Sequence, residues 1–241
     1  MAETVVRCEA LHKTFYSGLL RRKVRALRDA TFAVEQGEIL GFVGPNGAGK
    51  TTCLKILMGL VFPSGGQALL FGHPPGHAQA KRRVGFLPES PYFYEYLTGR
   101  ELLDFVGRLF GLDRALRRQR AGELLERTGL DDAADRRLRG YSKGMLQRIG
   151  LAQALMGDPD LLVLDEPMSG LDPLGRKDVR DLIAEQRERG KTVFFSTHIL
   201  PDVEQLCDRV ALIVRGEVRS IGRIEEQRGG LEQAFVREVG R

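Results

Sequence analysis

The sequence lacks tryptophan, has only three cysteines, and contains no long apolar run. Cys8, Cys53 and Cys207 are far apart and form no CxxC pair, so neither a disulfide framework nor a zinc site is indicated. No run approaches the ~20 apolar residues that a membrane-spanning helix needs. The segment Met1–Thr4 also lacks the basic and apolar regions of a signal peptide. We therefore expect a chain of the reducing cytosol, and another chain to cross the membrane if a membrane is involved.

The remaining composition is typical of a folded protein with a sizeable core. The 241 residues are 42% hydrophobic and 29% charged, which predicts one large domain or a core with a smaller lobe. The net charge of +5 comes from 37 basic and 32 acidic residues. Such a mild excess permits an anionic partner without requiring one.

The most informative stretch is a glycine-rich segment with the form of a phosphate loop. Three glycines let its backbone turn N–H groups towards phosphate oxygens. Lys50 is then placed for the β- and γ-phosphates of a nucleotide, and the Thr51 hydroxyl for Mg²⁺. The segment consists of Gly44, Pro45, Asn46, Gly47, Ala48, Gly49, Lys50, Thr51 and Thr52.

The flanking residues supply the context that this motif requires. Residues 38–43 form a short apolar run of strand type, and residues 53–58 have helical periodicity. A strand, a glycine-rich turn and a helix thus follow in order, with the positive end of the helix dipole directed at the anion. This context favours a phosphate loop over a chance lysine in a connecting loop.

The rest of the pattern predicts an α/β core interrupted by a helical lobe. Strand patterns disappear between residues 91 and 158, where leucines recur at helical spacing, so the core consists of residues 1–90 and 159–241. The other expected strands are 4–11, 24–27, 31–34, 67–71, 84–87, 161–164, 192–197, 210–214 and 217–221, with a basic turn at 18–23. The expected helices are 97–112, 114–128, one opening at Ser142, 174–189, 202–207 and 231–239.

Two adjacent acids follow the apolar strand 161–164. Carboxylates at the C-terminal end of such a strand are well placed for ligand chemistry. Asp165 can hold the shell of a magnesium ion, and Glu166 can polarise a water molecule. The pair therefore predicts hydrolysis of a phosphoanhydride bond.

Three other positions have both a structural and a functional interpretation. His198 ends the strand 192–197, where it is either a satisfied loop residue or a catalytic one. Ser142 is either an ordinary helix cap or part of a second anion site. Phe15 or Tyr16 either packs at a strand end or stacks on an adenine ring.

Arginine is concentrated in the helical lobe. A solvated face interleaved with acidic residues explains this best, because no aromatic residues alternate with the arginines as a nucleic-acid surface would require. No nucleic-acid partner is therefore expected, whereas an acidic partner or lipid headgroups remain open. The arginines are Arg114, Arg117, Arg118, Arg120, Arg127, Arg136, Arg137 and Arg139.

Taken together, these residues resemble the nucleotide-binding subunit of ATP-binding cassette (ABC) transporters across almost the whole chain. Six elements occur in the family's order: Phe15 or Tyr16, Gly44–Thr52, the Glu89 segment, residues 141–148, residues 161–172 and residues 196–198. The resemblance implies an α/β phosphate-loop NTPase core with a mixed sheet, an antiparallel β subdomain and an inserted helical subdomain. It also implies ATP and Mg²⁺ as cofactors.

The resemblance further implies a head-to-tail dimer that sandwiches two ATP molecules. Each ATP would be held by the phosphate loop of one subunit and by Ser142 and Gly144 of the other, with Asp172 at the interface. His198 would contact the γ-phosphate, and Phe15 would be the adenine platform rather than Tyr16.

Two departures from the family pattern are evident. The usual Leu-Ser-Gly-Gly-Gln is here Tyr-Ser-Lys-Gly-Met, with Lys143 and Met145 replacing Gly and Gln. The usual glutamine is here Glu89, which can still approach Mg²⁺ or water and would link the nucleotide to the lobe. Both variants are similar to those of export-type transporters whose ATPase is a separate polypeptide.

We therefore expect an ATPase subunit, a homodimer or heterodimer, bound to separate membrane permease subunits on the cytoplasmic face of the cell membrane. Export is the expected direction, and Glu166, His198 and Lys50 are the expected catalytic residues. The alternative is a soluble cassette ATPase, such as one of iron–sulfur cluster assembly. The sequence does not identify the transported substrate.

Overall fold

The computed structural model describes residues 3–17, 22–227 and 230–239, so residues 18–21 of the expected basic turn lie outside it. The strands are β1 (Thr4–Ser17), β2 (Arg22–Glu35), β3 (Ile39–Val43), β4 (Gly65–Leu70), β5 (Val84–Leu87), β6 (Leu161–Asp165), β7 (Thr192–Thr197), β8 (Arg209–Val214) and β9 (Glu217–Arg223). The α-helices are α1 (Lys50–Leu57), α2 (Ala78–Lys81), α3 (Gly99–Leu109), α4 (Arg114–Arg127), α5 (Lys143–Leu155), α6 (Pro173–Glu188), α7 (Leu200–Leu206), α8 (Ile224–Gln227) and α9 (Leu231–Val239), and a 3-10 turn spans Leu138–Gly140.

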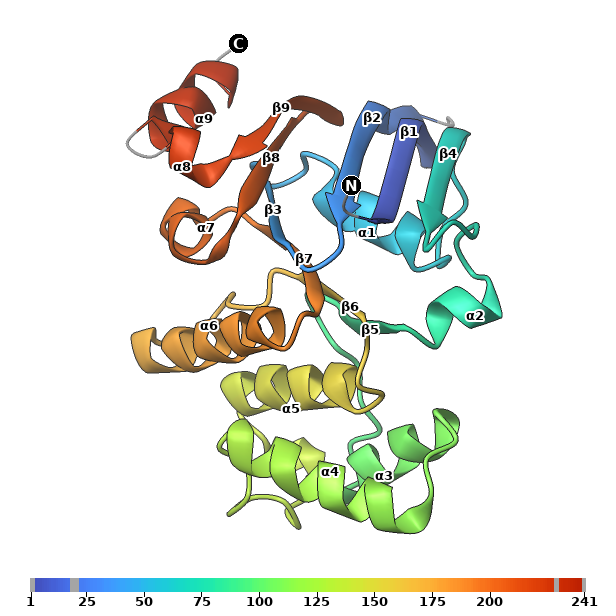
Figure 1. The fold of residues 1–241 in the computed structure, drawn as a ribbon, viewed down its shortest axis with the longest axis vertical. Helices are drawn as coiled ribbons and strands as arrows, with labels where there is room; N and C mark the ends of the chain where they lie inside the picture. The colour runs from blue at the N-terminus through green and yellow to red at the C-terminus, as the bar shows by residue number, and fades with distance from the viewer. Residues whose placement is uncertain (1–2, 18–21, 228–229, 240–241) are drawn as a thin grey trace.

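A six-stranded sheet in the order β5-β6-β7-β3-β8-β9 forms the centre of the core (Figure 1). Its strands are parallel except for the edge strand β9, which pairs antiparallel with β8. Every residue of β3, β6 and β7 is buried. This explains why these strands read as continuous apolar runs rather than as alternating patterns. The mixed α/β sheet expected from the sequence is confirmed.

A second, antiparallel sheet in the order β2-β1-β4 packs beside α1 (Figure 1). Two predictions about its strands are wrong. β1 does not end at residue 11 but continues to Ser17, and the two short strands expected at 24–27 and 31–34 are one strand, β2. The pairing of β1 with β2 contains register shifts, and Ala10 and Asp29 adopt positive φ angles of 47° and 93°. These irregularities break the alternation of side chains, which is why the pattern predicted shorter strands.

The helical lobe contains α3, α4 and α5, below the sheet in Figure 1. Its helices have clear start signals. Thr98 and Glu101 form a reciprocal capping box at α3, and the Asp113 carboxylate accepts a hydrogen bond of 2.9 Å from the Leu116 N–H at α4. Helix α3 starts at Gly99 rather than at the predicted 97, because this capping box sets its first turn, and it ends at Leu109 rather than at 112.

The lobe and the core share one hydrophobic cluster. It joins leucines of α3, α4 and α5 to residues of one sheet face, including Ile39 and Val43 of β3. Leu40 and Phe42 of the same strand point to a second cluster, beneath the antiparallel sheet and α1. Because successive strand residues face opposite sides, β3 connects the lobe side of the molecule with the phosphate-loop side.

Several lobe arginines have structural partners. Arg117 forms an ion pair of 2.7 Å with Asp104, and Arg127 pairs with Glu185 of α6. These contacts connect α3 to α4, and the lobe to the core. They agree with the interpretation that acidic residues neutralise much of the lobe's positive charge.

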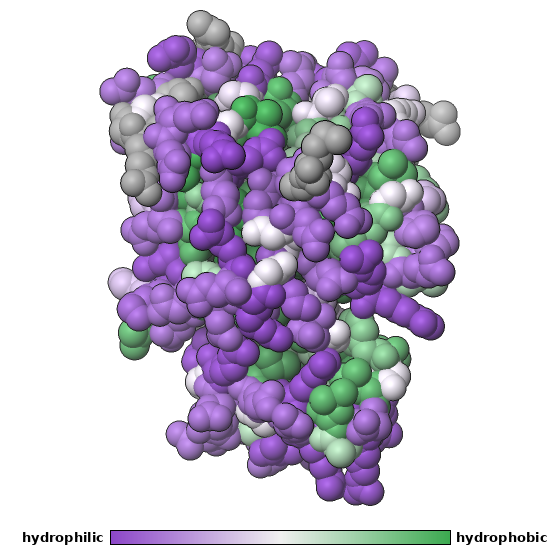
Figure 2. All heavy atoms as spheres, in the orientation of Figure 1, coloured by the Kyte–Doolittle hydropathy of each residue, from purple (hydrophilic) through white to green (hydrophobic). Residues whose placement is uncertain are grey.

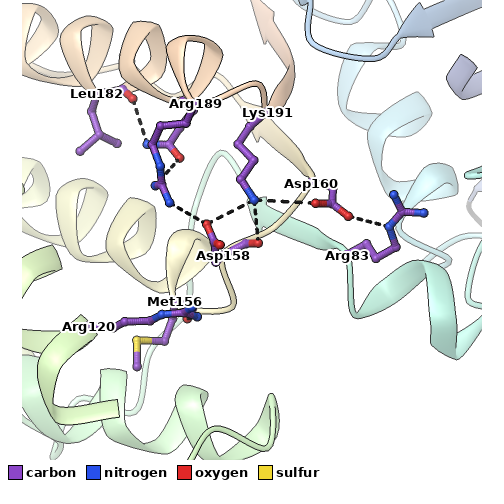
Figure 3. A network of polar contacts seen from close by, with 9 residues as sticks. Arg83, Arg120, Met156, Asp158, Asp160, Leu182, Arg189 and Lys191 are labelled. Carbon is purple, nitrogen blue, oxygen red and sulfur yellow. Dashed lines mark hydrogen bonds and ion pairs between the residues drawn. The ribbon is translucent and has the colours of Figure 1, made fainter. Parts of the chain in front are cut away.

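A polar network ties the point where the chain leaves the lobe to the core (Figure 3). Asp158, just after α5, lies 3.0 Å from Arg189 and 3.3 Å from Lys191. Lys191 also lies 3.7 Å from Asp160, which in turn pairs with Arg83 at 2.6 Å. A single exposed ion pair adds little to stability, but a network of several restrains the segment that joins the lobe to the core.

Among the described residues, no helix is long and apolar enough to cross a bilayer.

Candidate functional site

The phosphate loop connects the end of β3 to the start of α1, as the sequence predicts. The helix begins at Lys50, three residues before the predicted start at 53, so the loop leads directly into its first turn. Gly47 and Gly49 have φ angles of 79° and 109°, which favour glycine. A Cβ on Gly44 would lie 2.2 Å from the Ile213 carbonyl oxygen, so this position also admits only glycine.

A cavity of about 290 Å³ opens over this loop. Gly47 lines the cavity, and a Cβ added to it would meet no atom within 4 Å, so its backbone borders open space. The loop N–H groups and the N-terminus of α1 therefore surround a volume suited to an anion. Besides loop residues 46–52, the lining consists of Val24, Arg25, Ala26, Glu89 and Glu166.

Lys50 and Glu166 form a buried ion pair at the base of this cavity. The Lys50 Nζ lies 3.2 Å from the Glu166 Oε1, and their side chains are only 6% and 7% exposed. The Lys50 ammonium also donates a hydrogen bond of 2.7 Å to the Gly44 carbonyl oxygen. The other carboxylate oxygen of Glu166, Oε2, lies 2.9 Å from Nδ1 of His198, which is nearly half exposed. Three predicted catalytic residues are thus in direct contact.

Strand β6 delivers Asp165 and Glu166 to the same edge of the sheet as the phosphate loop, because β3, β7 and β6 run parallel. Asp165 is 1% exposed, and its Oδ1 accepts a hydrogen bond of 2.6 Å from the Ser196 hydroxyl. The Ser196 Oγ in turn accepts a hydrogen bond of 3.1 Å from the Glu166 N–H. Ser196 thus holds both acids, a role that its sequence pattern did not indicate. Its position beside His198 at a strand end was the available signal.

Glu166 adopts a left-handed backbone with φ of 52°. This conformation is unfavourable for a residue with a Cβ and persists only where the surroundings enforce it. Here the Glu166 N–H is held by the Ser196 carbonyl oxygen and hydroxyl. The turn directs the Glu166 carboxylate back towards Lys50.

The donor set fits a magnesium ion with nucleotide phosphates. Thr51 and Glu89 line the cavity, and Asp165 lies one residue from Glu166. Hydroxyl and carboxylate oxygens with phosphate oxygens are the ligands that Mg²⁺ prefers. Among the described residues, no group of three or more His, Cys, Asp and Glu could hold a metal without such help.

Phe15 does not itself line the cavity but pairs with a residue that does. It is the cross-strand partner of Val24, which lines the cavity, whereas Tyr16 is paired with Lys23. Directly opposed residues of an antiparallel pair share one face of the sheet, so Phe15 is on the side of Val24. The Phe15 ring is 39% exposed, with the Lys13 ammonium 4.8 Å from its centroid.

The other predicted nucleotide-binding residues lie outside this cavity. Ser142 is the exposed N-cap of α5, where its hydroxyl accepts a hydrogen bond of 3.3 Å from the Met145 N–H. Asp172 caps α6 in the same way, accepting from the Gly175 N–H at 2.9 Å, a structural role that the sequence analysis missed. A Cβ on Gly144 would lie 3.4 Å from Leu171. These three residues form a separate surface of the same chain.

The geometry therefore combines a phosphate loop, a buried acid pair and a histidine at one sheet edge. The model of the ABC transporter family matches residues 27–169, more than half of the chain. The chain belongs to the ABC transporter family. As a member of this family it is an ATPase that binds ATP.

Known relatives of this ABC ATPase support the assignment. An uncharacterized ABC transporter ATP-binding protein of Nostoc sp. is 50% identical over 94% of this chain and 68% of that protein. The bacitracin transport ATP-binding protein BcrA of Bacillus licheniformis is 43% identical over 77% of this chain and 60% of that protein. The chain thus spans 68% and 60% of the length of these two relatives.

Solved structures share the cassette fold. An ATP-binding subunit of an ABC transporter has a TM-score of 0.84 and 31% identity, covering 98% of this chain and 97% of that one. A dimeric cassette in a post-hydrolysis state, bound to ADP and Pi, has a TM-score of 0.83, 24% identity, and coverage of 91% and 98%. The fold expected from the sequence, a phosphate-loop core with an antiparallel β subdomain and a helical subdomain, is confirmed.

Proposed function

We propose that this ABC ATPase hydrolyses MgATP as a head-to-tail dimer and drives export through separate membrane permease subunits. The observation that carries the proposal is the contact between Lys50 and Glu166 at the phosphate loop, with Ser142 on a different surface. One chain therefore has a catalytic half-site and a second anion-binding half-site that do not meet.

In the catalytic half, each group has a distinct task. The N–H groups of residues 46–52 bind the β-phosphate, and the Lys50 ammonium binds the β- and γ-phosphates. Thr51, Asp165 and Glu89 would hold Mg²⁺, directly or through water. When bound, Mg²⁺ neutralises phosphate charge and stabilises the negative charge that develops in the transition state.

Glu166 is the proposed general base. Its carboxylate orients the attacking water and accepts the proton as the oxygen attacks the γ-phosphorus and the bond to ADP breaks. For this, Lys50 must release Glu166 and turn to the phosphate, an exchange that the 3.2 Å distance permits. His198, 2.9 Å from the same carboxylate, keeps it oriented and contacts the γ-phosphate.

The second half-site supports a dimer. Ser142 and Gly144 present the N-terminus of the 13-residue helix α5, whose backbone N–H groups favour an anion. Asp172, the N-cap of α6, lies beside this surface, where the Gly170 backbone is covered by the Lys143 side chain. In a head-to-tail dimer, a second subunit brings this surface to the γ-phosphate, with Asp172 at the interface. The partner is a second copy or a related cassette.

An exposed aromatic patch on the lobe supports a membrane-protein partner. It consists of Tyr94, Tyr96 and Phe105, which are 41–66% exposed, and the Tyr94 ring contacts the other two. Figure 2 shows hydrophobic side chains gathered on the part of the lobe that α3 forms. Exposed aromatics of this density mark protein interfaces. The patch would receive the permease at the cytoplasmic face of the membrane.

The export direction rests on two observations. The relative BcrA is named for bacitracin transport, and another relative of Bacillus subtilis, 37% identical, is named a linearmycin resistance ATP-binding protein. Lys143, Met145 and Glu89 add the sequence variants described above. Both groups of observations favour an exporter with a separate ATPase.

Copurification from native membranes tests the proposal. A tagged chain is expected to retain a membrane protein, and replacing Phe105 with Asp is expected to release it while ATPase activity of the isolated chain persists. Val236→Asp, at an exposed valine of α9, is the matched control. Recovery of iron–sulfur assembly proteins without any membrane protein would contradict the transport proposal.

A further inference from the structure

Arg25 lines the cavity over the phosphate loop, yet the assigned nucleotide-binding residues do not include it. It lies on β2 between Val24 and Ala26. At Ala26 this strand touches the loop so closely that a Cβ on Gly49 would come within 2.5 Å of the Ala26 carbonyl oxygen. Val24, which precedes Arg25 on the same strand, pairs with Phe15.

These neighbours place Arg25 along the length of a bound nucleotide. The loop contact at Ala26 marks the phosphate end, and the pairing with Phe15 marks the end where a base stacks. Between a base and its terminal phosphates lie the ribose and the α-phosphate. Arg25, which lines the cavity between these two points, is therefore nearer the α-phosphate region than the γ-phosphate, where Lys50 and Glu166 lie.

The charge balance of the cavity indicates an anion partner for Arg25. Of the described residues that line the cavity, four are charged: Arg25, Lys50, Glu89 and Glu166. Lys50 is paired with Glu166, whereas Arg25 has no ion pair or side-chain hydrogen bond with any described residue. Without Arg25, the lining would carry more negative than positive charge and would repel a polyphosphate. A guanidinium also matches phosphate oxygens with two parallel donors.

We propose that Arg25 binds the α-phosphate of the nucleotide held by the phosphate loop, and so sets the affinity for ATP and ADP alike. This inference rests on the proposed nucleotide site. It distinguishes Arg25 from Lys50, whose contacts favour the triphosphate.

Titration calorimetry of the full chain with MgADP, and with a non-hydrolysable β,γ-methylene analogue of ATP, tests the inference. For Arg25→Gln we expect the Kd of both ligands to rise by the same factor, about 5- to 10-fold. This loss of affinity lies between the loss expected for an exposed ion pair and the loss expected for a buried charge-assisted hydrogen bond. Arg25→Lys keeps the charge and is expected to lose less than about threefold, because only the second donor is removed.

The matched control is Arg28→Gln, an exposed arginine on the same strand that does not line the cavity. Its Kd values are expected to stay within about twofold of the wild type, since it is a distant, screened charge. An unchanged Kd in Arg25→Gln, or a loss confined to the ATP analogue, would overturn the inference. Failure of the wild type itself to bind either nucleotide would instead overturn the proposed nucleotide site.

Discussion

The Lys50 ammonium and the Glu166 carboxylate lie 3.2 Å apart, and both are almost fully buried. In this arrangement the group proposed to bind the terminal phosphates also neutralises the proposed general base. A nucleotide that takes up Lys50 therefore sets Glu166 free for a water molecule. On the proposed mechanism, the pair would couple occupation of the phosphate loop to activation of the base.

This coupling predicts the behaviour of Lys50→Ala. Nucleotide binding and turnover are expected to be lost, and the free energy of unfolding to fall by about 3 kcal/mol, because a buried carboxylate loses its partner. Adding Glu166→Gln removes that charge and is expected to restore part of the stability, as urea denaturation of the four variants would measure. Lys55→Ala, at an exposed lysine of α1, is the control. Normal turnover in Lys50→Ala would refute the phosphate-loop assignment.

The two adjacent aromatics of β1 give a second prediction. Phe15→Ala is expected to weaken binding of ADP by about tenfold, the loss that removal of one base-stacking contact causes. Tripolyphosphate, which has no base, is expected to bind both variants alike in a competition assay. Tyr16→Ala serves as the matched control and should leave the Kd of ADP unchanged. If Tyr16→Ala were the weaker binder, the adenine platform would be assigned to the wrong residue.

The Ser196 hydroxyl is expected to position the magnesium-binding acid without touching the nucleotide. In Ser196→Ala the carboxylate of Asp165 loses a hydrogen bond of 2.6 Å. The Mg²⁺ concentration for half-maximal ATPase activity should therefore rise by about 10-fold, whereas the Kd of metal-free ATP should not change. Ser220→Ala, at an exposed serine of β9, is the control. A proportional loss of activity at all Mg²⁺ concentrations would argue against this positioning role.

Most of the phosphate site could be predicted from sequence because its residues are local. The loop 44–52 needs only its own glycines and the flanking strand and helix, and Asp165 and Glu166 follow directly from their strand. Contacts between distant segments could not be predicted. The pairing of Lys50 with Glu166, the hold of Ser196 on both acids, and the place of Arg25 in the cavity all depend on the order of strands in the two sheets.

The strand boundaries also could not be predicted from sequence, because they depend on pairing between segments. β1 and β2 stay paired through register shifts, with Ala10 and Asp29 in left-handed conformations. Tertiary pairing overrides the local interruption of the alternating pattern. The sequence alone therefore predicted shorter strands.

A pH prediction concerns the link between α3 and α4. The Arg117 guanidinium, and then Arg108, lower the pKa of the Asp104 carboxyl. A depressed carboxyl pKa stabilises the folded state above the unfolded pKa near 4, and this contribution is lost as pH falls through the folded value. Asp104→Asn is therefore expected to lower the Tm at pH 7 by about 2–4 °C. The difference from the wild type should shrink below about pH 3, and an unchanged difference there would contradict this account.

The most direct test of dimer-dependent hydrolysis is the molar mass of Glu166→Gln with MgATP. This variant keeps the phosphate loop but lacks the base, so turnover should fall by about 100-fold or more and the closed dimer should accumulate. Light scattering after gel filtration is expected to give twice the protomer mass of 26.9 kDa with MgATP, and the protomer mass with MgADP. A protomer mass at saturating MgATP, together with near-normal turnover, would contradict both the composite site and the assignment of Glu166 as base.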